Sequence, residues 1–320
     1  MTWQNKYRTI GLSALIIIMA AVIGLFLISS NPPPPNSPAT APSNHSPGRV
    51  IRIVAAENFW GSLAQQLGGA HVNVTSIVTD PNADPHEYES STANARAIAN
   101  ASIVIVNGVG YDDWALRLIS AGSVPNQTVL NVADLLAVPN GSNPHLWYDP
   151  TDVNKTVKQM YLDLVKIDPS DAGYYAQRYS SVTASLAQLD GQMAMIKQHF
   201  WGTKVASTES IFVYLANATG LDLISPPSFM DSVAEGGDPP TQSIIAFENQ
   251  LEGKNVSVLV YNEQTLTPLT QQMKQIAAQH NITMVGVTET IQPSGMTFQA
   301  WMSAQLLQLQ SALNTSTLVR

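Results

Sequence analysis

Two short segments of nearly the same pattern each place a histidine directly after a proline. "NADPHEYES" carries His86, and "SNPHLWYDP" carries His145 about sixty residues later. Imidazole is the commonest side-chain metal ligand, so the two segments could form two halves of one metal site. A single histidine in a loop is more often merely solvated, and the metal hypothesis therefore needs further ligands.

Two glutamates supply such ligands. Glu209 follows the apolar segment "KVAST", and Glu289 closes the segment "ITMVGVTE". Ligands of open α/β sheets bind beyond the carboxyl ends of the strands. We therefore expect a cleft between two lobes to hold both glutamates together with His86 and His145, a set that suits a divalent transition metal. Each glutamate also has a plainer interpretation. Glu209 could be an ordinary residue at a helix N-terminus, where the helix dipole favours it, and Glu289 could simply be exposed to solvent after a strand.

The segments that must position these residues alternate between strand and helix patterns. "RVIRIVAA" is a β-branched run that predicts a buried first strand, and Phe59, Leu63 and Leu67 recur after it at helical spacing. Three further strands are predicted, in "VNVTSIVT", "SIVIVNG" and "TVLNVADL". This order is typical of a parallel sheet with helices on its faces.

The segment from residue 149 to residue 200 is helical in pattern and is broken only at Asp168-Pro169. At 1.5 Å per residue, its last 30 or so residues would extend about 45 Å, which predicts one helix that spans two lobes. Strand and helix patterns then restart. They are interrupted by "SFMDSVAEGGDPPTQ", which we expect to be a solvated acidic loop, with a place at the border of the cleft as the alternative.

The predicted fold is an α/β protein with two lobes, each a parallel sheet with flanking helices, joined by one long helix. The predicted boundaries are a membrane anchor or signal at 1–30, a proline-rich tether at 31–48, an N-terminal lobe at 49–169, the connecting helix at 170–200 and a C-terminal lobe at 201–320.

The N-terminal segment predicts a membrane attachment. Residues 10–28 carry no charge, a length that fits a span of about 20 residues, and no Ala-x-Ala site follows. An uncleaved anchor is therefore favoured over the alternative of a cleaved signal. Lys6 and Arg8 precede the run, so the folded part is expected outside the cytoplasm, held at the cell surface by an extended tether.

Composition narrows the classes of function and chemistry. A net charge of −8 and a pI near 5.1 argue against a nucleic-acid partner. Cysteine is absent, so the chain has no disulfide, no thiolate metal site and no lipid-bearing cysteine.

Asparagine is found unusually often in N-x-S/T sequons, at about three times the frequency expected by chance. This enrichment predicts a glycoprotein, and a set of unused sequons is the open alternative. The sequons begin at Asn44, Asn73, Asn100, Asn126, Asn140, Asn154, Asn217, Asn255, Asn281 and Asn314.

Residues 51–313 resemble the zinc- and manganese-binding receptors of prokaryotic ABC importers. The resemblance implies that His86, His145, Glu209 and Glu289 are the metal ligands, held between two lobes that move little on binding. Glu209 stands where many manganese receptors have Glu and many zinc receptors have His, and Glu289 stands where Asp is usual. The matching segments are "AAENFWGSLAQQLGG", "DPHEYE", "NPHLWYDP", "STESIFVYLANATGL" and "VGVTETIQPSGMTFQAWM".

The resemblance implies an extracytoplasmic solute-binding receptor that delivers a metal to an ABC permease and its ATPase, acting as a monomer and not as an enzyme. A place on a surface for the permease is then a further alternative for the segment "SFMDSVAEGGDPPTQ". We expect manganese to be favoured over zinc, with iron third, because two carboxylates make the site rich in oxygen. The chain departs from the family in lacking a His-rich loop between His86 and His145 and in lacking a lipid-bearing cysteine, whose role the apolar segment would take.

Two rival functions stay open at this point. One is a surface metalloenzyme such as a hydrolase, although four protein ligands would close the position that a catalytic zinc keeps for water. The other is a metal-binding surface adhesin without a role in transport.

Overall fold

Two separate sheets of four parallel strands each form the centre of the computed structural model, which describes residues 50–81, 88–122 and 124–318. The strands are β1 (Ile51–Glu57), β2 (Val72–Val78), β3 (Ile103–Val106), β4 (Thr128–Asn131), β5 (Lys204–Ser207), β6 (Asp222–Leu223), β7 (Val258–Asn262) and β8 (Thr283–Val287). The first sheet has the order β2-β1-β3-β4, and the second has the order β6-β5-β7-β8.

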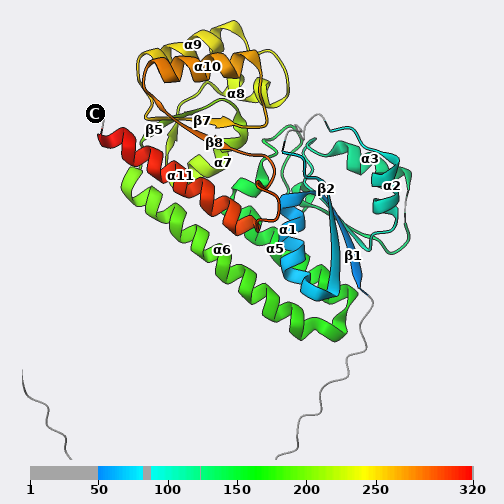
Figure 1. Ribbon diagram of the computed structural model, residues 1–320. Helices are drawn as coiled ribbons and strands as arrows, with labels where there is room; N and C mark the ends of the chain where they lie inside the picture. The colour runs from blue at the N-terminus through cyan, green and yellow to red at the C-terminus, as the bar shows by residue number, and fades with distance from the viewer. Residues whose placement is uncertain (1–49, 82–87, 123, 319–320) are drawn as a thin grey trace, which may run out of the picture. The chain divides into compact units, whose positions relative to one another are not determined.

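Helices connect the parallel strands, as crossover connections require, and flank both sheets (Figure 1). The α-helices are α1 (Asn58–Gly68), α2 (Thr92–Ala99), α3 (Asp113–Ala121), α4 (Val132–Leu136), α5 (Pro150–Ile167), α6 (Ala172–Phe200), α7 (Val213–Thr219), α8 (Pro227–Ala234), α9 (Thr241–Glu252), α10 (Pro268–Gln279) and α11 (Phe298–Leu318). Short 3-10 turns are η1 (Gly69–His71), η3 (Leu146–Tyr148), η4 (Pro169–Asp171) and η5 (Ser210–Phe212).

The β-branched runs are buried because both faces of each sheet are covered. Along β1, Ile53 and Ala55 join one hydrophobic cluster, while Val54 and Ala56 point the other way into a second cluster with Trp114. Successive strand residues alternate between faces. A parallel sheet with covered faces therefore needs an almost continuous apolar run.

The long helix α6 joins the two halves of the chain. Its 29 residues extend about 43 Å, and it contacts α1 and α5 of the first half, α7 of the second half, and α11. Its buried residues recur at intervals of three, four or seven positions, which gives one apolar stripe along its length. The stripe consists of Tyr175, Val182, Leu186, Leu189, Met193, Ile196 and Phe200.

The prediction of a two-lobed α/β fold with a bridging helix is confirmed. The boundaries drawn for the lobes stay predictions. Two local predictions are wrong. The strand predicted through "TVLNVADL" stops at Asn131. The side chain of Asn131 accepts a hydrogen bond from the backbone N–H of Asp134 and so caps α4. The expected acidic loop contains α8, because Phe229, Met230 and Val233 are buried on one side of it.

The N-terminal anchor and tether predicted at 1–48 lie outside the described residues. Among the helices that are described, none combines the length and apolarity that a membrane crossing requires.

Candidate metal centre

His145 immediately precedes η3, and its ring is completely buried. The side-chain oxygen of Asn143 accepts a hydrogen bond from the backbone N–H of His145 (3.0 Å) and lies 2.6 Å from the ring Nδ1. An Nδ1–H that donates to this oxygen fixes the orientation of the ring and turns Nε2 toward Glu209 and Glu289. The edge of the His145 ring also meets buried Trp147, with the ring centres 5.2 Å apart.

Glu209 and Glu289 reach the same point from the second sheet. Glu209 follows β5 and Glu289 follows β8, and both side chains are fully buried. The Nε2 atom of His145 lies 3.2 Å from Oε1 of Glu289 and 3.7 Å from Oε1 of Glu209. One ligand atom from each of the three residues falls within 4.8 Å of the other two, as expected for side chains at the carboxyl ends of parallel strands.

Two neutral groups donate hydrogen bonds to the carboxylates. The amide of Asn262, at the end of β7, lies 2.8 Å from Oε1 of Glu289 and 3.0 Å from Oε1 of Glu209. The hydroxyl of Tyr111 donates to Oε2 of Glu289 at 2.9 Å. Oε2 of Glu209 is buried and has no hydrogen-bond partner among the described residues.

The electrostatics of this pocket disfavour two free negative charges. Burial, reinforced by the nearby charge of Glu289, raises the pKa of Glu209 to about 8. No described lysine or arginine forms an ion pair with Glu209, and the basic group that faces it is the ring of His145. Buried charges need a compensating charge or they become neutral. A divalent cation between the three side chains would supply that charge, and the unpartnered Oε2 of Glu209 offers it a further oxygen.

The structure therefore brings together three of the four predicted ligands. His86, the fourth, lies outside the described residues, and its place in the site stays a prediction. Glu289 is buried, so the alternative of an exposed residue is wrong. Glu209 does stand at the N-terminal end of η5, as its alternative expected, but its side chain makes no capping hydrogen bond there and faces His145.

Several polar residues beside the site were missed from the sequence. Asn262 ends β7 and Tyr111 follows β3, so the same rule about strand ends would have found them. An amide and a phenol are not usual metal ligands, so their residue types alone do not mark them as part of a metal site.

Glu57 is a further buried carboxylate that the sequence did not indicate. It ends β1 and is buried beside Asp112, which raises its pKa in addition to the effect of burial. Burial also raises the pKa of Asp112 to about 6. The Asp112 carboxylate accepts the backbone N–H groups of Asn107 (2.5 Å) and Gly108 (2.8 Å), and it thereby holds the loop that carries Tyr111.

An open cavity of about 670 Å³ lies next to the cluster, between the first and second halves of the chain. Tyr111, Asn143 and Ser210 line it, so it borders residues that contact or adjoin the ligands. Asp113, Asp231 and Glu235 give its wall a negative charge. A cation would be attracted to such a cavity.

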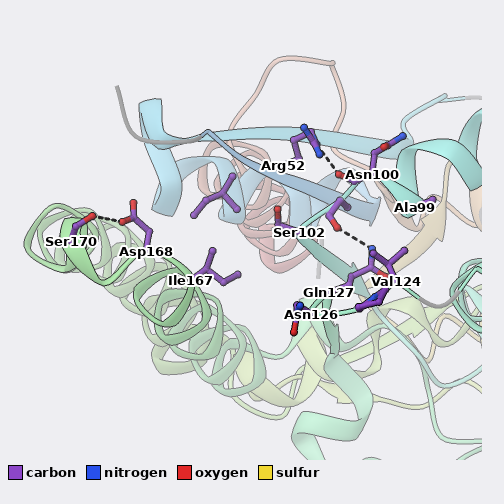
Figure 2. Close-up of a pocket in the computed structure, with 13 residues that line it drawn as sticks. Arg52, Ala99, Asn100, Ser102, Val124, Asn126, Gln127, Ile167, Asp168 and Ser170 are labelled. Carbon is purple, nitrogen blue, oxygen red and sulfur yellow. Dashed lines mark hydrogen bonds between the residues drawn. The ribbon is translucent and has the colours of Figure 1, made fainter. Parts of the chain in front are cut away.

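A second cluster of the same residue types lies elsewhere, where η1 meets η4. Nδ1 of His71 lies 2.7 Å from Oδ2 of Asp171, and Asp168 is within reach of both. Asp168 accepts hydrogen bonds from Ser170 (2.5 Å) and Tyr175 (3.1 Å), and Figure 2 shows the first of these. The ring of His71 stacks on Tyr174. This network ties η1 to the start of α6.

Most of the folded part of the chain matches one known protein family. Residues 53–312 match the sequence profile described as ZnuA, zinc-uptake complex component A, periplasmic. The chain is 28% identical over 184 residues to the manganese-binding lipoprotein MntA of Halalkalibacterium halodurans, a match that spans 55% of this chain and 60% of that protein. It is 19% identical to the high-affinity zinc uptake system protein ZnuA of Bacillus subtilis, over 86% of this chain and 91% of that one.

Solved structures of low sequence identity share the fold. The periplasmic zinc-binding protein TroA of Treponema pallidum aligns with a TM-score of 0.71 at 15% identity, over 82% of this chain and 99% of that chain. The solute-binding protein FpvC of Pseudomonas aeruginosa, in complex with Mn²⁺, aligns with a TM-score of 0.68 at 20% identity, over 83% of this chain and 99% of that chain.

Proposed function

The chain belongs to the ZnuA family of periplasmic zinc-uptake complex components, and from this premise we propose that it is a receptor for a divalent transition metal, with His145, Glu209 and Glu289 among the ligands and His86 as the fourth. The family consists of uptake components, which agrees with the prediction that the chain is not an enzyme. The metal is cargo, so the protein's task is to bind it and to release it unchanged.

One observation carries this proposal: an imidazole and two carboxylates converge in a fully buried pocket to which the described residues bring no lysine or arginine. The pKa of Glu209 is raised by burial and by Glu289, and its Oε2 has no hydrogen-bond partner within the described part of the chain. A pocket with these properties is stabilised by a cation more than by any neutral ligand. A fourth protein ligand at His86 would also close the water position that a catalytic zinc, held by three protein ligands, keeps open.

We further propose manganese as the preferred cargo. Two carboxylates offer up to four oxygens beside the imidazole nitrogens, and oxygen-rich sets suit manganese, whereas a third histidine in place of Glu209 would favour zinc. The relatives' names support both metals, since MntA is a manganese-binding lipoprotein and the Bacillus subtilis ZnuA belongs to a zinc uptake system. Zinc also binds such sites tightly, because it stands above manganese in the general order of affinity.

The proposed partners are a membrane permease and its ATPase, and the proposed location is outside the cytoplasm, at the membrane. The cation would approach through the acidic cavity beside Tyr111, where Asp113, Asp231 and Glu235 increase its local concentration.

The test uses the metal-free full-length chain. It is mixed with equimolar manganese, zinc and iron, and the bound metal is measured by mass spectrometry after removal of free ions. We expect one transition-metal ion per chain, with manganese in excess over zinc. A chain that retains no metal under these conditions rules out the receptor function, and zinc in excess rules out only the choice of metal.

A second experiment separates transport from the adhesin alternative. A strain that lacks the gene should accumulate less manganese, and the wild-type gene should restore uptake while Glu209→Gln should not. Normal uptake in a strain that lacks a protein shown to bind metal would favour adhesion or storage.

A further inference from the structure

The asparagines of this chain fall into two groups with different surroundings. Nine of the ten sequon asparagines lie in the described part of the chain, and eight of the nine are exposed. The ninth, Asn154, is half-buried, and its amide donates to the carbonyl of Pro150 at 2.8 Å. The exposed eight are Asn73, Asn100, Asn126, Asn140, Asn217, Asn255, Asn281 and Asn314.

The seven described asparagines outside sequons show the opposite distribution. Only Asn249 is exposed. Each of the other six has a side chain that makes a hydrogen bond holding a loop, a helix end or the metal pocket; they are Asn58, Asn94, Asn107, Asn131, Asn143 and Asn262. If sequons arose only because serine and threonine are frequent, both groups would have similar exposure.

The composition of the chain gives a second, independent observation. Only 12% of its residues are charged, whereas globular domains have about 25% and well-hydrated surfaces carry about 25–35% charged residues. A surface with so few charges needs another source of hydration. Asparagine-linked sugars are bulky and solubilising, and they would supply it.

We propose that the eight exposed sequons are sites of N-glycosylation by a lipid-linked oligosaccharide. In this reaction the side-chain amide nitrogen of asparagine attacks the anomeric carbon of the sugar. The new bond joins Nδ2 to that carbon, the bond from the carbon to the lipid phosphate breaks, the lipid phosphate leaves, and the amide loses one proton to the transferase. The proposal requires that the folded chain lie outside the cytoplasm, as the predicted orientation and the periplasmic description of the family support.

The structure also ranks the sites. Asn100 and Asn126 line one surface cavity of about 540 Å³ (Figure 2), so a bulky sugar on one hinders modification of the other. The amide of Asn100 already donates to the carbonyl of Arg96 at 2.8 Å. We therefore expect Asn126 to be modified in preference to Asn100, and Asn154 to stay unmodified because its amide is engaged and half-buried.

The experiment isolates the full-length chain from the membranes of its own cells and maps glycopeptides by mass spectrometry. We expect an intact mass above that of the 34.4 kDa polypeptide, sugar on the exposed sequons, and none on Asn154 or Asn249. Asn249 is the matched control, because it is exposed but is not followed by serine or threonine at the second position.

A pair of variants tests the sequon itself. Ser142→Ala leaves Asn140 in place and should abolish the sugar on Asn140 alone, whereas Ser142→Thr should retain it. Unmodified peptides at all eight exposed sequons would overturn the proposal. Equal modification of Asn249, or a sugar on Asn140 that survives Ser142→Ala, would overturn it as well.

Discussion

Two clusters in this protein contain a histidine and two carboxylates at metal-binding spacing, and they differ in what surrounds them. In the first, His145, Glu209 and Glu289 are fully buried, and the pKa of Glu209 is raised. In the second, the side chain of His71 is 29% exposed, and hydrogen bonding from Ser170 lowers the pKa of Asp168. Clusters built from the same kinds of side chain therefore shift a carboxyl pKa in opposite directions, upward at Glu209 and downward at Asp168.

The difference shows that spacing alone does not define a metal site. At the second cluster, the hydroxyls of Ser170 and Tyr175 already donate to Asp168, and Asp171 lies 2.7 Å from the ring of His71. At the first cluster, burial removes water, and the donors from Asn262 and Tyr111 are neutral. Only the first cluster has a charge imbalance that a cation would correct.

The largest expected effect on metal affinity comes from neutralising a carboxylate of the first cluster. The same change in the second cluster is the control. Glu209→Gln should weaken manganese binding by more than about 100-fold, beyond the 10–100-fold typical of residues that only support ligands. The matched variant Asp168→Asn should change the affinity by less than about twofold. Isothermal titration calorimetry on the full-length chain measures both, and a second bound metal ion that Asp168→Asn removes would contradict the comparison.

A smaller loss is expected when the bridging amide of the first cluster is removed. Asn262→Ala deletes the donor shared by Oε1 of Glu209 and Oε1 of Glu289, so the two carboxylates repel each other and lose their fixed positions. We expect manganese affinity to fall about 10–100-fold. Asn249→Ala, at an exposed asparagine, is the control, and equal affinities for the two variants would show that the amide has no role in binding.

The pH dependence should also separate the clusters. In the metal-free protein the pKa of Glu209 is raised from 4.5 to about 8, so its contribution to stability is present below pH 4.5 and is lost as the pH rises through 8. The pKa of Asp168 is lowered, so its contribution is present above its ordinary pKa of 3.8 and is lost as the pH falls. Melting temperatures of wild type and Glu209→Gln between pH 4 and 9 measure the first effect.

The same proton competes with the cation. Because Glu209 must lose its proton before it can bind manganese, manganese affinity should weaken roughly tenfold for each pH unit below 8. Affinity should fall further when the imidazoles become protonated. An affinity that is flat from pH 8 to pH 5 would show that no proton is displaced.

The smallest effect is expected at the second cluster. His71→Ala removes a partly exposed ion pair and a ring stacked on Tyr174, contacts worth about 1 kcal/mol together. Unfolding in urea should show this loss, with metal binding unchanged. If the variant unfolded at the same urea concentration as the wild type but bound less metal, the second cluster would be a functional site.

The sequence was sufficient for the features that depend on periodicity. Apolar runs predicted three of the four strands of the first sheet within a residue or two, and the length of the unbroken helical pattern after Pro169 predicted the bridging helix. The strand predicted through Leu135 failed because the Asn131 side chain caps α4, a local hydrogen bond that competes with strand pairing.

For the site, the sequence predicted the residue types that can bind a metal but not their supporting partners. His145, Glu209 and Glu289 could be named because only a few side chains can bind a metal. Asn262 and Tyr111 also lie at or after strand ends, but their residue types do not mark them as metal ligands. An amide and a phenol acquire their role only from the two carboxylates, which meet them through tertiary packing. The raised pKa of Glu209 likewise arises from burial, which no local pattern encodes.

Helix α6 has a practical consequence for anyone who would turn this protein into a fluorescent metal sensor. Its buried stripe contacts elements of both halves, so a large closing rotation would have to bend about eight helical turns or repack the shared core. Dyes placed at the far ends of the two lobes would thus report little change in distance. The absence of cysteine allows one thiol to be introduced at the rim of the acidic cavity, for instance in place of exposed Asp113, where a polarity-sensitive dye would respond to the arriving ion.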